Sequence, residues 1–192
     1  MKPAIFFDRD GTLLVEMGYL AHPSLVRPYA LTAEALRLAR AAGFLLVMVT
    51  NQSGVARGWL SERDLGAVHD KMQTMLGSED AGLDAIYYCP HHPEGTVGAY
   101  RQACLCRKPG VALGERAIRE LAIDPARSLV IGDKMSDIRF GLALGLKACL
   151  VRTGFGAREE QAAREPHLSG VHVAGDVLEA VKWAIAEGAR LA

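Results

Sequence analysis

Short apolar runs alternate with amphipathic stretches along most of the chain. The run from 44 to 49 is continuously apolar, which is typical of a strand covered on both faces. Ser61, with Asp64 three residues later, is a typical helix start. The pattern predicts strands at 4–7, 44–49, 84–89, 128–132, 147–152 and, at an edge, 171–174, and helices at about 31–42, 61–76, 111–121, 135–144 and 177–189. This alternation predicts an α/β fold, a doubly wound (Rossmann-like) parallel sheet with helices on both faces.

The length of the chain and the spacing of these elements indicate one domain. The chain has 192 residues, which suffices for one ordinary hydrophobic core but not for two. Because no repeat or linker interrupts the pattern, we expect a single domain over 1–192. The connections at 15–30 and 90–107 are longer than most, and such loops usually serve function or hold a metal.

Composition and charge narrow the possible partners. Half of the residues are hydrophobic, and 22 basic residues balance 22 acidic ones. Zero net charge argues against a nucleic-acid partner, which normally requires a basic excess. No apolar run reaches the roughly 18 to 20 residues of a membrane span, and the N-terminus has no cleavable signal pattern. We therefore expect a cytoplasmic protein without a membrane partner, and a monomer by default because no helix shows a coiled-coil pattern.

Polar clusters follow several of the predicted strands, where open α/β sheets bind ligands. Asp8, Arg9 and Asp10 follow the first strand; alternation along an extended chain would turn both carboxylates to one side. Each cluster alone fits solvated charge, a helix cap or a turn. Four of them at consecutive strand ends indicate one shared site, formed by 8–10, 50–53, 107–108 and 132–137.

A second constellation combines three cysteines with one histidine. Cys89, His91, Cys104 and Cys106 make a tetrahedral zinc set, closed and therefore structural. The alternatives are a disulfide between Cys104 and Cys106, which is sterically poor at that spacing, or unrelated reduced thiols. We expect the zinc loop, about 89–106, to hold the adjacent cations rather than to touch substrate. His92 is interpreted as a neighbouring surface residue.

Two segments carry a family resemblance: Asp8-Arg9-Asp10-Gly11-Thr12 and the later Gly132-Asp133-Lys134-Met135-Ser136-Asp137. Over about 4–181 the chain resembles the haloacid dehalogenase (HAD) superfamily of phosphotransferases. The resemblance implies a HAD fold without a large cap domain. It implies that Asp8 is the nucleophile that forms an aspartyl-phosphate. Asp10 would act as general acid and then as general base.

The same resemblance implies the remaining parts of a phosphatase site. Mg²⁺ would be held by Asp8, Asp133 and the Asp10 carbonyl, with Lys134 contributing through its backbone. Thr50 and Lys108 would bind the phosphoryl oxygens, and Asp137 would orient Lys108 or a metal-bound water.

Two groups of bacterial HAD members without a cap carry a zinc loop that this sequence resembles. One group acts on a heptose bisphosphate and the other on histidinol phosphate. The long insert between His91 and Cys104 is like that of the first group. The resemblance therefore implies a small sugar bisphosphate as substrate, in the synthesis of nucleotide-activated heptose for lipopolysaccharide, with histidinol phosphate as the alternative.

A bisphosphate needs a second anion site, for which Arg107 is the best candidate because a guanidinium grips phosphate through two hydrogen bonds. Arg57 and Arg101 are interpreted mainly as solvated charges. Met17 replaces a commonly polar position in the sugar-contacting loop. The residues expected to bind substrate are Asp8, Arg9, Asp10, Glu16, Met17, Gly18, Tyr19, Thr50, Asn51, Gln52, Ser53, Arg107 and Lys108.

Two other classes of function stay open. A nucleic-acid end phosphatase would need a basic groove with stacking aromatics, and only 6% of the residues are aromatic. A non-catalytic, zinc-dependent binding module would not need the intact set of Asp8, Asp10, Lys108 and Asp133.

Overall fold

The computed structural model describes residues 1–189, within which six parallel strands form one sheet. The strand order is β3-β2-β1-β4-β5-β6, so the order reverses between β1 and β4. The strands are β1 (Ala4–Phe7), β2 (Leu45–Asn51), β3 (Ala85–Cys89), β4 (Leu129–Gly132), β5 (Lys147–Val151) and β6 (His172–Ala174). This is the doubly wound arrangement that the alternating pattern predicts.

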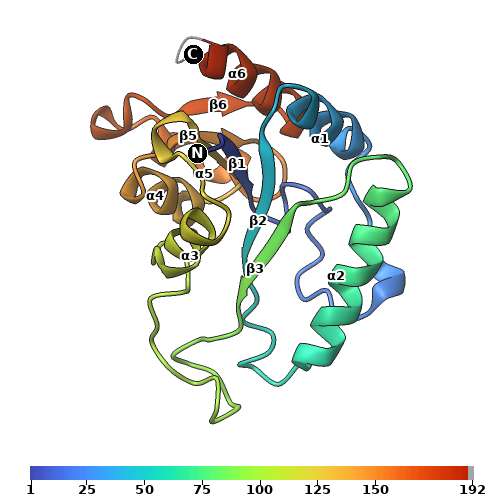
Figure 1. Cartoon of the computed structure of the whole chain (residues 1–192). Helices are drawn as coiled ribbons and strands as arrows, with labels where there is room; N and C mark the ends of the chain where they lie inside the picture. The colour runs from blue at the N-terminus through green and yellow to red at the C-terminus, as the bar shows by residue number, and fades with distance from the viewer. Residues whose placement is uncertain (190–192) are drawn as a thin grey trace.

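Helices cover both faces of the sheet, as Figure 1 shows. The α-helices are α1 (Thr32–Ala41), α2 (Glu62–Gly77), α3 (Ala112–Glu120), α4 (Met135–Ala143), α5 (Gly156–Ala163) and α6 (Val177–Ala189), and the short 3-10 turns are η1 (Pro23–Leu25), η2 (Pro125–Arg127) and η3 (Pro166–Leu168). Ser61 caps α2 as predicted, because its hydroxyl accepts from the Asp64 N–H and the Asp64 carboxylate accepts from the Ser61 N–H.

Two apolar layers result from the alternation of side chains along β1. Ile5 and Phe7 pack with residues of α1, α2 and α6. Ala4 and Phe6 pack with residues of α3, α4 and α5, and the Phe6 ring meets the Phe140 ring edge-on. Because both faces of the central strands are buried, those strands are continuously apolar.

Two elements differ from the sequence prediction. Strand β2 continues through Thr50 and Asn51 rather than ending at Val49, so these polar residues belong to the strand itself. Helix α5 was not predicted, because only Gly156 and Ala163 of it are buried and it has no apolar stripe. Within residues 1–189 no helix is both long and apolar enough to span a membrane.

Candidate active site

A polar pocket of about 330 Å³ lies at the carboxyl edge of the sheet, over the ends of β1, β2 and β4. Open α/β sheets bind ligands at this edge, beside the point where the strand order reverses. Its volume is in the range of small-molecule sites. The lining residues are Asp8, Asp10, Glu16, Gly18, Tyr19, Thr50, Asn51, Gln52, Ser53, Gly54, Arg107, Lys108, Lys134, Ser136, Asp137 and Phe155.

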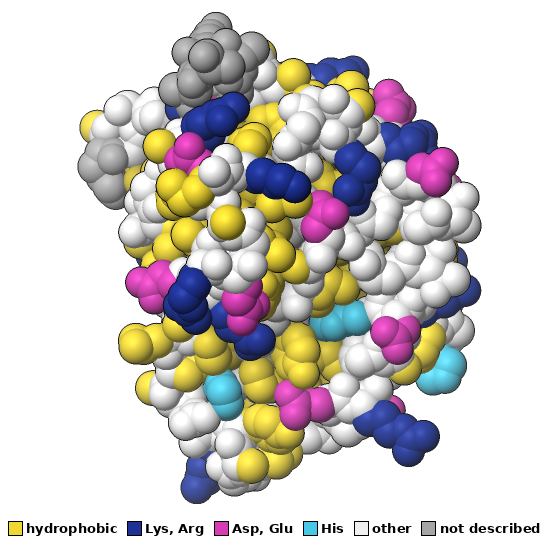
Figure 2. All heavy atoms as spheres, viewed as in Figure 1, with side chains coloured by type: hydrophobic (Ala, Val, Ile, Leu, Met, Phe, Trp, Pro, Cys, Tyr) yellow, Lys and Arg dark blue, Asp and Glu magenta, His cyan; other side chains and the backbone are white. Residues whose placement is uncertain are grey.

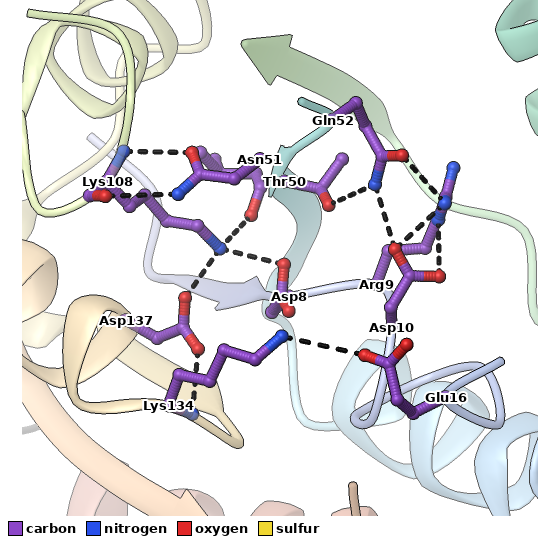
Figure 3. A network of polar contacts seen from close by, with 11 residues as sticks. Asp8, Arg9, Asp10, Glu16, Thr50, Asn51, Gln52, Lys108, Lys134 and Asp137 are labelled. Carbon is purple, nitrogen blue, oxygen red and sulfur yellow. Dashed lines mark hydrogen bonds and ion pairs between the residues drawn. The ribbon is translucent and has the colours of Figure 1, made fainter. Parts of the chain in front are cut away.

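Asp8, Lys108 and Asp137 form a buried ionic cluster (Figure 3). Lys108 Nζ lies 2.8 Å from Asp8 Oδ1 and 2.7 Å from Asp137 Oδ1. Burial alone would lower the pKa of Lys108, but the two carboxylates outweigh burial and hold that pKa above its ordinary value. Burial alone would raise the pKa of Asp8, but the Lys108 ammonium holds it below its ordinary value. The pocket therefore presents an ionised carboxylate beside a fixed cation.

Strand β2 holds Lys108 in this position. The Asn51 side chain grips the Lys108 backbone: its Nδ2 donates to the carbonyl at 3.0 Å and its Oδ1 accepts from the N–H at 2.9 Å. Lys108 Nζ also donates to the Val49 carbonyl at 2.5 Å. The segment after the cysteine cluster is thus attached to a central strand.

Asp133, directly after β4, is fully buried behind Asp8. Its Oδ2 accepts from the Phe155 N–H at 2.8 Å, whereas its Oδ1 has no hydrogen-bond partner among residues 1–189. Burial, together with the negative charge of Asp8, raises the pKa of Asp133 to about 8. Gly11 (φ 85°) and Gly154 (φ 57°) come so close that a Cβ on either would overlap this carboxylate. An unpaired buried oxygen beside a second carboxylate suits a hard cation.

The carboxylates of Asp8, Asp133 and Asp137 offer oxygens within 4.8 Å of one another. Both oxygens of Asp137 already have partners: Oδ1 contacts Lys108 Nζ, and Oδ2 accepts from the Lys134 N–H at 3.0 Å. Asp8 and Asp133 therefore fit Mg²⁺ better than Asp137 does. The Lys134 carbonyl, the expected backbone contact, accepts from the Asp137 N–H at 2.9 Å in the first turn of α4, and its contact with the metal stays a prediction.

Asp10 lies beyond the end of β1, and its two carboxylate oxygens are held from one side. Arg9 Nε donates to Oδ1 at 3.0 Å, and Arg9 Nη2 donates to Oδ2 at 2.8 Å. Gln52 Nε2 donates to Asp10 Oδ2 and to Thr50 Oγ1, both at 2.9 Å. The pocket therefore holds a carboxylate of fixed direction beside the Thr50 hydroxyl.

Asp8 and Asp10 both line the pocket, but strand alternation does not place Asp10 there. Strand β1 ends at Phe7, and Asp10 is placed by a turn in which the Leu13 and Leu14 N–H groups donate to the Arg9 carbonyl. Arg9 itself lies outside the pocket lining. Its side chain is fully buried because its guanidinium is engaged behind Asp10.

The loop expected to contact the sugar reaches the pocket in part. Glu16 and Gly18 line it, with Glu16 Oε1 accepting from the Gly18 N–H at 2.7 Å and Glu16 Oε2 lying 3.5 Å from Lys134 Nζ. Tyr19 also lines it and stacks edge-on against Trp59, with ring centroids 3.9 Å apart. Met17 is exposed and lies outside the lining, so the departure at this position falls at the periphery of the pocket.

Of the three candidate arginines, only Arg107 lines the pocket. Its Nη1 is buried and has no hydrogen-bond partner in the part of the chain that the structure describes. Arg57 instead lies 3.8 Å from Glu94 and over the Trp59 ring, and Arg101 is exposed outside the lining. A second anion next to Lys108 would find its partner in Arg107.

The cysteine cluster has the dimensions of a zinc site. Cys106 Sγ lies 3.1 Å from Cys89 Sγ and 3.2 Å from both Cys104 Sγ and His91 Nδ1. Around zinc, tetrahedral thiolates stand about 3.8 Å apart, as Zn–S distances of about 2.3 Å require, so a small expansion of this cluster would admit the ion. All four cysteines of the chain are free thiols, Cys149 among them. His92 points elsewhere: its Nδ1 accepts from the Glu94 N–H.

Several residues at the site escaped prediction. Gly54 and Phe155 line the pocket because loops fold over the strand ends. His69 contacts Arg9 from α2, and nothing in its sequence context distinguishes it from an ordinary core histidine. These positions have no motif of their own, so only the tertiary structure assigns them to the site.

Comparisons with known proteins agree on one family. Residues 105–180 match the family model described as HAD-hydrolase-like. A D-glycero-beta-D-manno-heptose-1,7-bisphosphate 7-phosphatase from Haemophilus influenzae is 44% identical over 155 residues, which is 80% of this chain and 84% of that protein. The protein of the same name from Escherichia coli K12 is 44% identical over 154 residues, 79% of this chain and 80% of its own length.

Solved structures give the same result. A D,D-heptose 1,7-bisphosphate phosphatase from B. bronchiseptica, in complex with magnesium and phosphate, superposes with a TM-score of 0.84 at 30% identity, covering 97% of this chain and 99% of that one. A putative HAD-like phosphatase from Mesorhizobium loti superposes with a TM-score of 0.85 at 31% identity, covering 99% and 87%.

Proposed function

This chain belongs to the HAD-like phosphatase family of these relatives, and we propose that it removes the 7-phosphate of D-glycero-β-D-manno-heptose 1,7-bisphosphate. The observation that carries the proposal is one pocket with two anion sites. Lys108 stands beside the ionised Asp8, and Arg107, whose Nη1 has no hydrogen-bond partner within residues 1–189, follows in the same lining. A sugar bisphosphate matches this pair, and the names of the relatives specify which one.

In the proposed first step, an Asp8 carboxylate oxygen attacks phosphorus and the bond from phosphorus to the sugar oxygen breaks. Asp10 gives a proton to the departing alkoxide. In the second step, Asp10 takes a proton from water, the water oxygen bonds to phosphorus, and the acyl-phosphate bond breaks to release phosphate and Asp8. Lys108 offsets the repulsion between nucleophile and phosphoryl group throughout, and the Thr50 hydroxyl contacts a phosphoryl oxygen.

Asp8 and Asp133 are the residues that would hold Mg²⁺. The fit rests on Asp133 Oδ1, which has no partner among the described residues, and on the two buried carboxylates that lie close together. When bound, the ion would neutralise charge on the phosphoryl group. Asp137 serves by fixing Lys108, since both of its oxygens are engaged by protein groups.

The second phosphate of the substrate would bind Arg107, which can donate two hydrogen bonds to it. Zinc in the cluster of Cys89, His91, Cys104 and Cys106 would hold the segment that carries Arg107 and Lys108. We propose that the whole chain, 1–192, acts as one phosphatase domain in the cytoplasm.

A small molecule rather than nucleic acid is the proposed partner. Figure 2 shows acidic side chains scattered among the basic ones on the viewed face, without a continuous basic surface. The net charge of the chain is zero. Nucleic-acid sites depend on an excess of basic groups.

The test is Mg²⁺-dependent phosphate release from five substrates: the β and α anomers of the heptose bisphosphate, fructose 1,6-bisphosphate, histidinol phosphate and a 3′-phosphorylated oligonucleotide. We expect the highest kcat/KM for the β-heptose bisphosphate. Asp8→Asn should abolish turnover and remain folded, whereas Asp70→Asn, on the exposed side of α2, should act as wild type. A preference for histidinol phosphate would overturn the substrate, and no release from any ester would overturn the reaction.

A further inference from the structure

The Arg9 guanidinium is fully buried, and its N–H groups are directed at three side chains. Arg9 Nε and Nη2 donate to the Asp10 carboxylate, and Nη2 also donates to Gln52 Oε1 at 2.9 Å (Figure 3). Nη1 points away from the pocket, toward Nε2 of His69 at 3.1 Å. The direction of the Asp10 carboxylate therefore depends on a guanidinium that is itself held from behind.

His69 lies on the inner side of α2, with 6% of its surface exposed. Burial first, and then the charge of Arg9, lower the pKa of His69 to about 3, so the ring is neutral near pH 7. Because arginine only donates, Nε2 accepts the hydrogen bond and Nδ1 carries the proton. The ring lies 5.7 Å from the Tyr88 ring, and the Tyr88 hydroxyl donates to Glu62 Oε1 at 3.0 Å.

We propose that His69 is a positioning residue for proton transfer, which fixes the direction of the Asp10 carboxylate through Arg9. The inference rests on the proposed function, in which Asp10 protonates the leaving alkoxide. Without an acceptor at Nη1, a buried donor is left unpaired, which favours rotation of the guanidinium or entry of water. Either change moves the carboxylate, and proton transfer falls steeply when donor and acceptor leave hydrogen-bond reach.

Two substrates with different leaving groups distinguish a misdirected Asp10 carboxylate from a general loss of active-site structure. A sugar alkoxide needs a proton in order to leave, whereas 4-nitrophenolate leaves without one, and kcat/KM reports the steps through that departure. We expect His69→Leu to lower kcat/KM for the heptose bisphosphate about tenfold and for 4-nitrophenyl phosphate less than about twofold. His69→Gln, which keeps an acceptor near Nη1, should restore most of the loss. Equal losses on the two esters would overturn the inference.

Three further variants complete the test. Val68→Ala removes buried apolar volume from the neighbouring position of α2, and should lower stability without changing the ratio of the two kcat/KM values. His69→Met, with only a weak acceptor, replaces the leucine variant if that variant does not fold. Asp10→Asn should change the ratio in the same direction as His69→Leu and further. If Asp10→Asn discriminates and the His69 variants do not, the His69 inference alone fails; if Asp10→Asn does not discriminate, the proton-donor assignment in the proposed function fails with it.

Discussion

At the scale of single residues, buried charge dominates this site. Asp8, Arg9, Lys108, Asp133 and Asp137 are each at most 6% exposed. Buried charges are tolerated only with partners, and four of the five have them. Asp133 is the exception, because one of its oxygens has no partner within the described chain. The pairing fixes the ionised state of Asp8, and the missing partner identifies where a cation would bind.

His69 should make the stability of the protein depend on pH. Its pKa is 6.5 in the unfolded chain and about 3 when folded, so between these values the unfolded chain binds more protons and acid favours unfolding. The stabilisation is complete above pH 6.5 and is lost toward pH 3. Compared with His69→Gln, the wild type should lose on the order of 2 kcal/mol more unfolding free energy between about pH 6.5 and 4.5. Urea unfolding at each pH measures this difference, and parallel curves would contradict it.

Among the elements, the zinc loop and β2 together hold Lys108 in position. The loop ends in Cys106, immediately before Arg107 and Lys108, and Asn51 of β2 grips the Lys108 backbone. The loop has no regular secondary structure between β3 and α3, so its conformation depends on side-chain contacts and, in the proposed holoenzyme, on zinc. Structural zinc stabilises such segments by on the order of 10 kcal/mol.

Removing zinc should therefore weaken substrate binding more than chemistry. We expect Cys104→Ala, or chelation of the metal, to raise KM for the bisphosphate by about tenfold, because Arg107 loses its fixed position and one charged hydrogen bond is worth about 1.5 kcal/mol or more. Hydrogen exchange should become faster over 89–108. Cys149→Ala, a change in the buried part of β5, is the matched control and should leave both measurements unaltered. If hydrogen exchange and KM stay unchanged after zinc loss has been verified, the loop keeps its conformation without the metal and the prediction is wrong.

At the scale of the whole molecule, the site joins the two halves of the sheet. Asp8 follows β1 and Asp133 follows β4, the adjacent strands at which the order reverses. Parallel strands bring their carboxyl ends to one edge, so residues more than a hundred positions apart along the chain become neighbours. A cation bound there would tie the two halves together.

Mg²⁺ should stabilise the folded protein, since the proposed ligands are carboxylates that only folding brings together. At an ion concentration about a hundredfold above its dissociation constant, the gain is about 2.7 kcal/mol, and Tm should rise by about 5 to 10 °C for a chain of this size. Asp133→Asn should abolish the rise, and Asp124→Asn, in the cap of η2 before the amino end of β4, should retain it. Scanning calorimetry with and without the ion gives the comparison; an equal rise in Asp133→Asn would place the ion elsewhere.

Most helices and strands, and the order in which the chemically active residues follow them, could be predicted from local patterns in the sequence. Hydrophobic periodicity depends on local geometry, so the doubly wound sheet and all of its strands could be predicted, with ends shifted by a few residues. Helix α5 could not, because it buries almost nothing and leaves no periodic signal. The polar residues at the strand ends could also be recognised as one site, because the carboxyl ends of parallel strands meet at one edge of the sheet.

The hydrogen-bond partners of those side chains, in contrast, follow from the fold and could not be predicted. Arg9 was predicted to touch substrate, yet it lies behind Asp10, and His69, which no motif marks, lies behind Arg9. Hydrogen bonds between residues distant in sequence depend on the relative placement of β1, β2 and α2, and residue types and spacing carry no information about that placement. Asp133 Oδ1 and Arg107 Nη1 likewise have no hydrogen-bond partner in the described part of the chain, and a missing partner can be recognised only when the neighbours are in place.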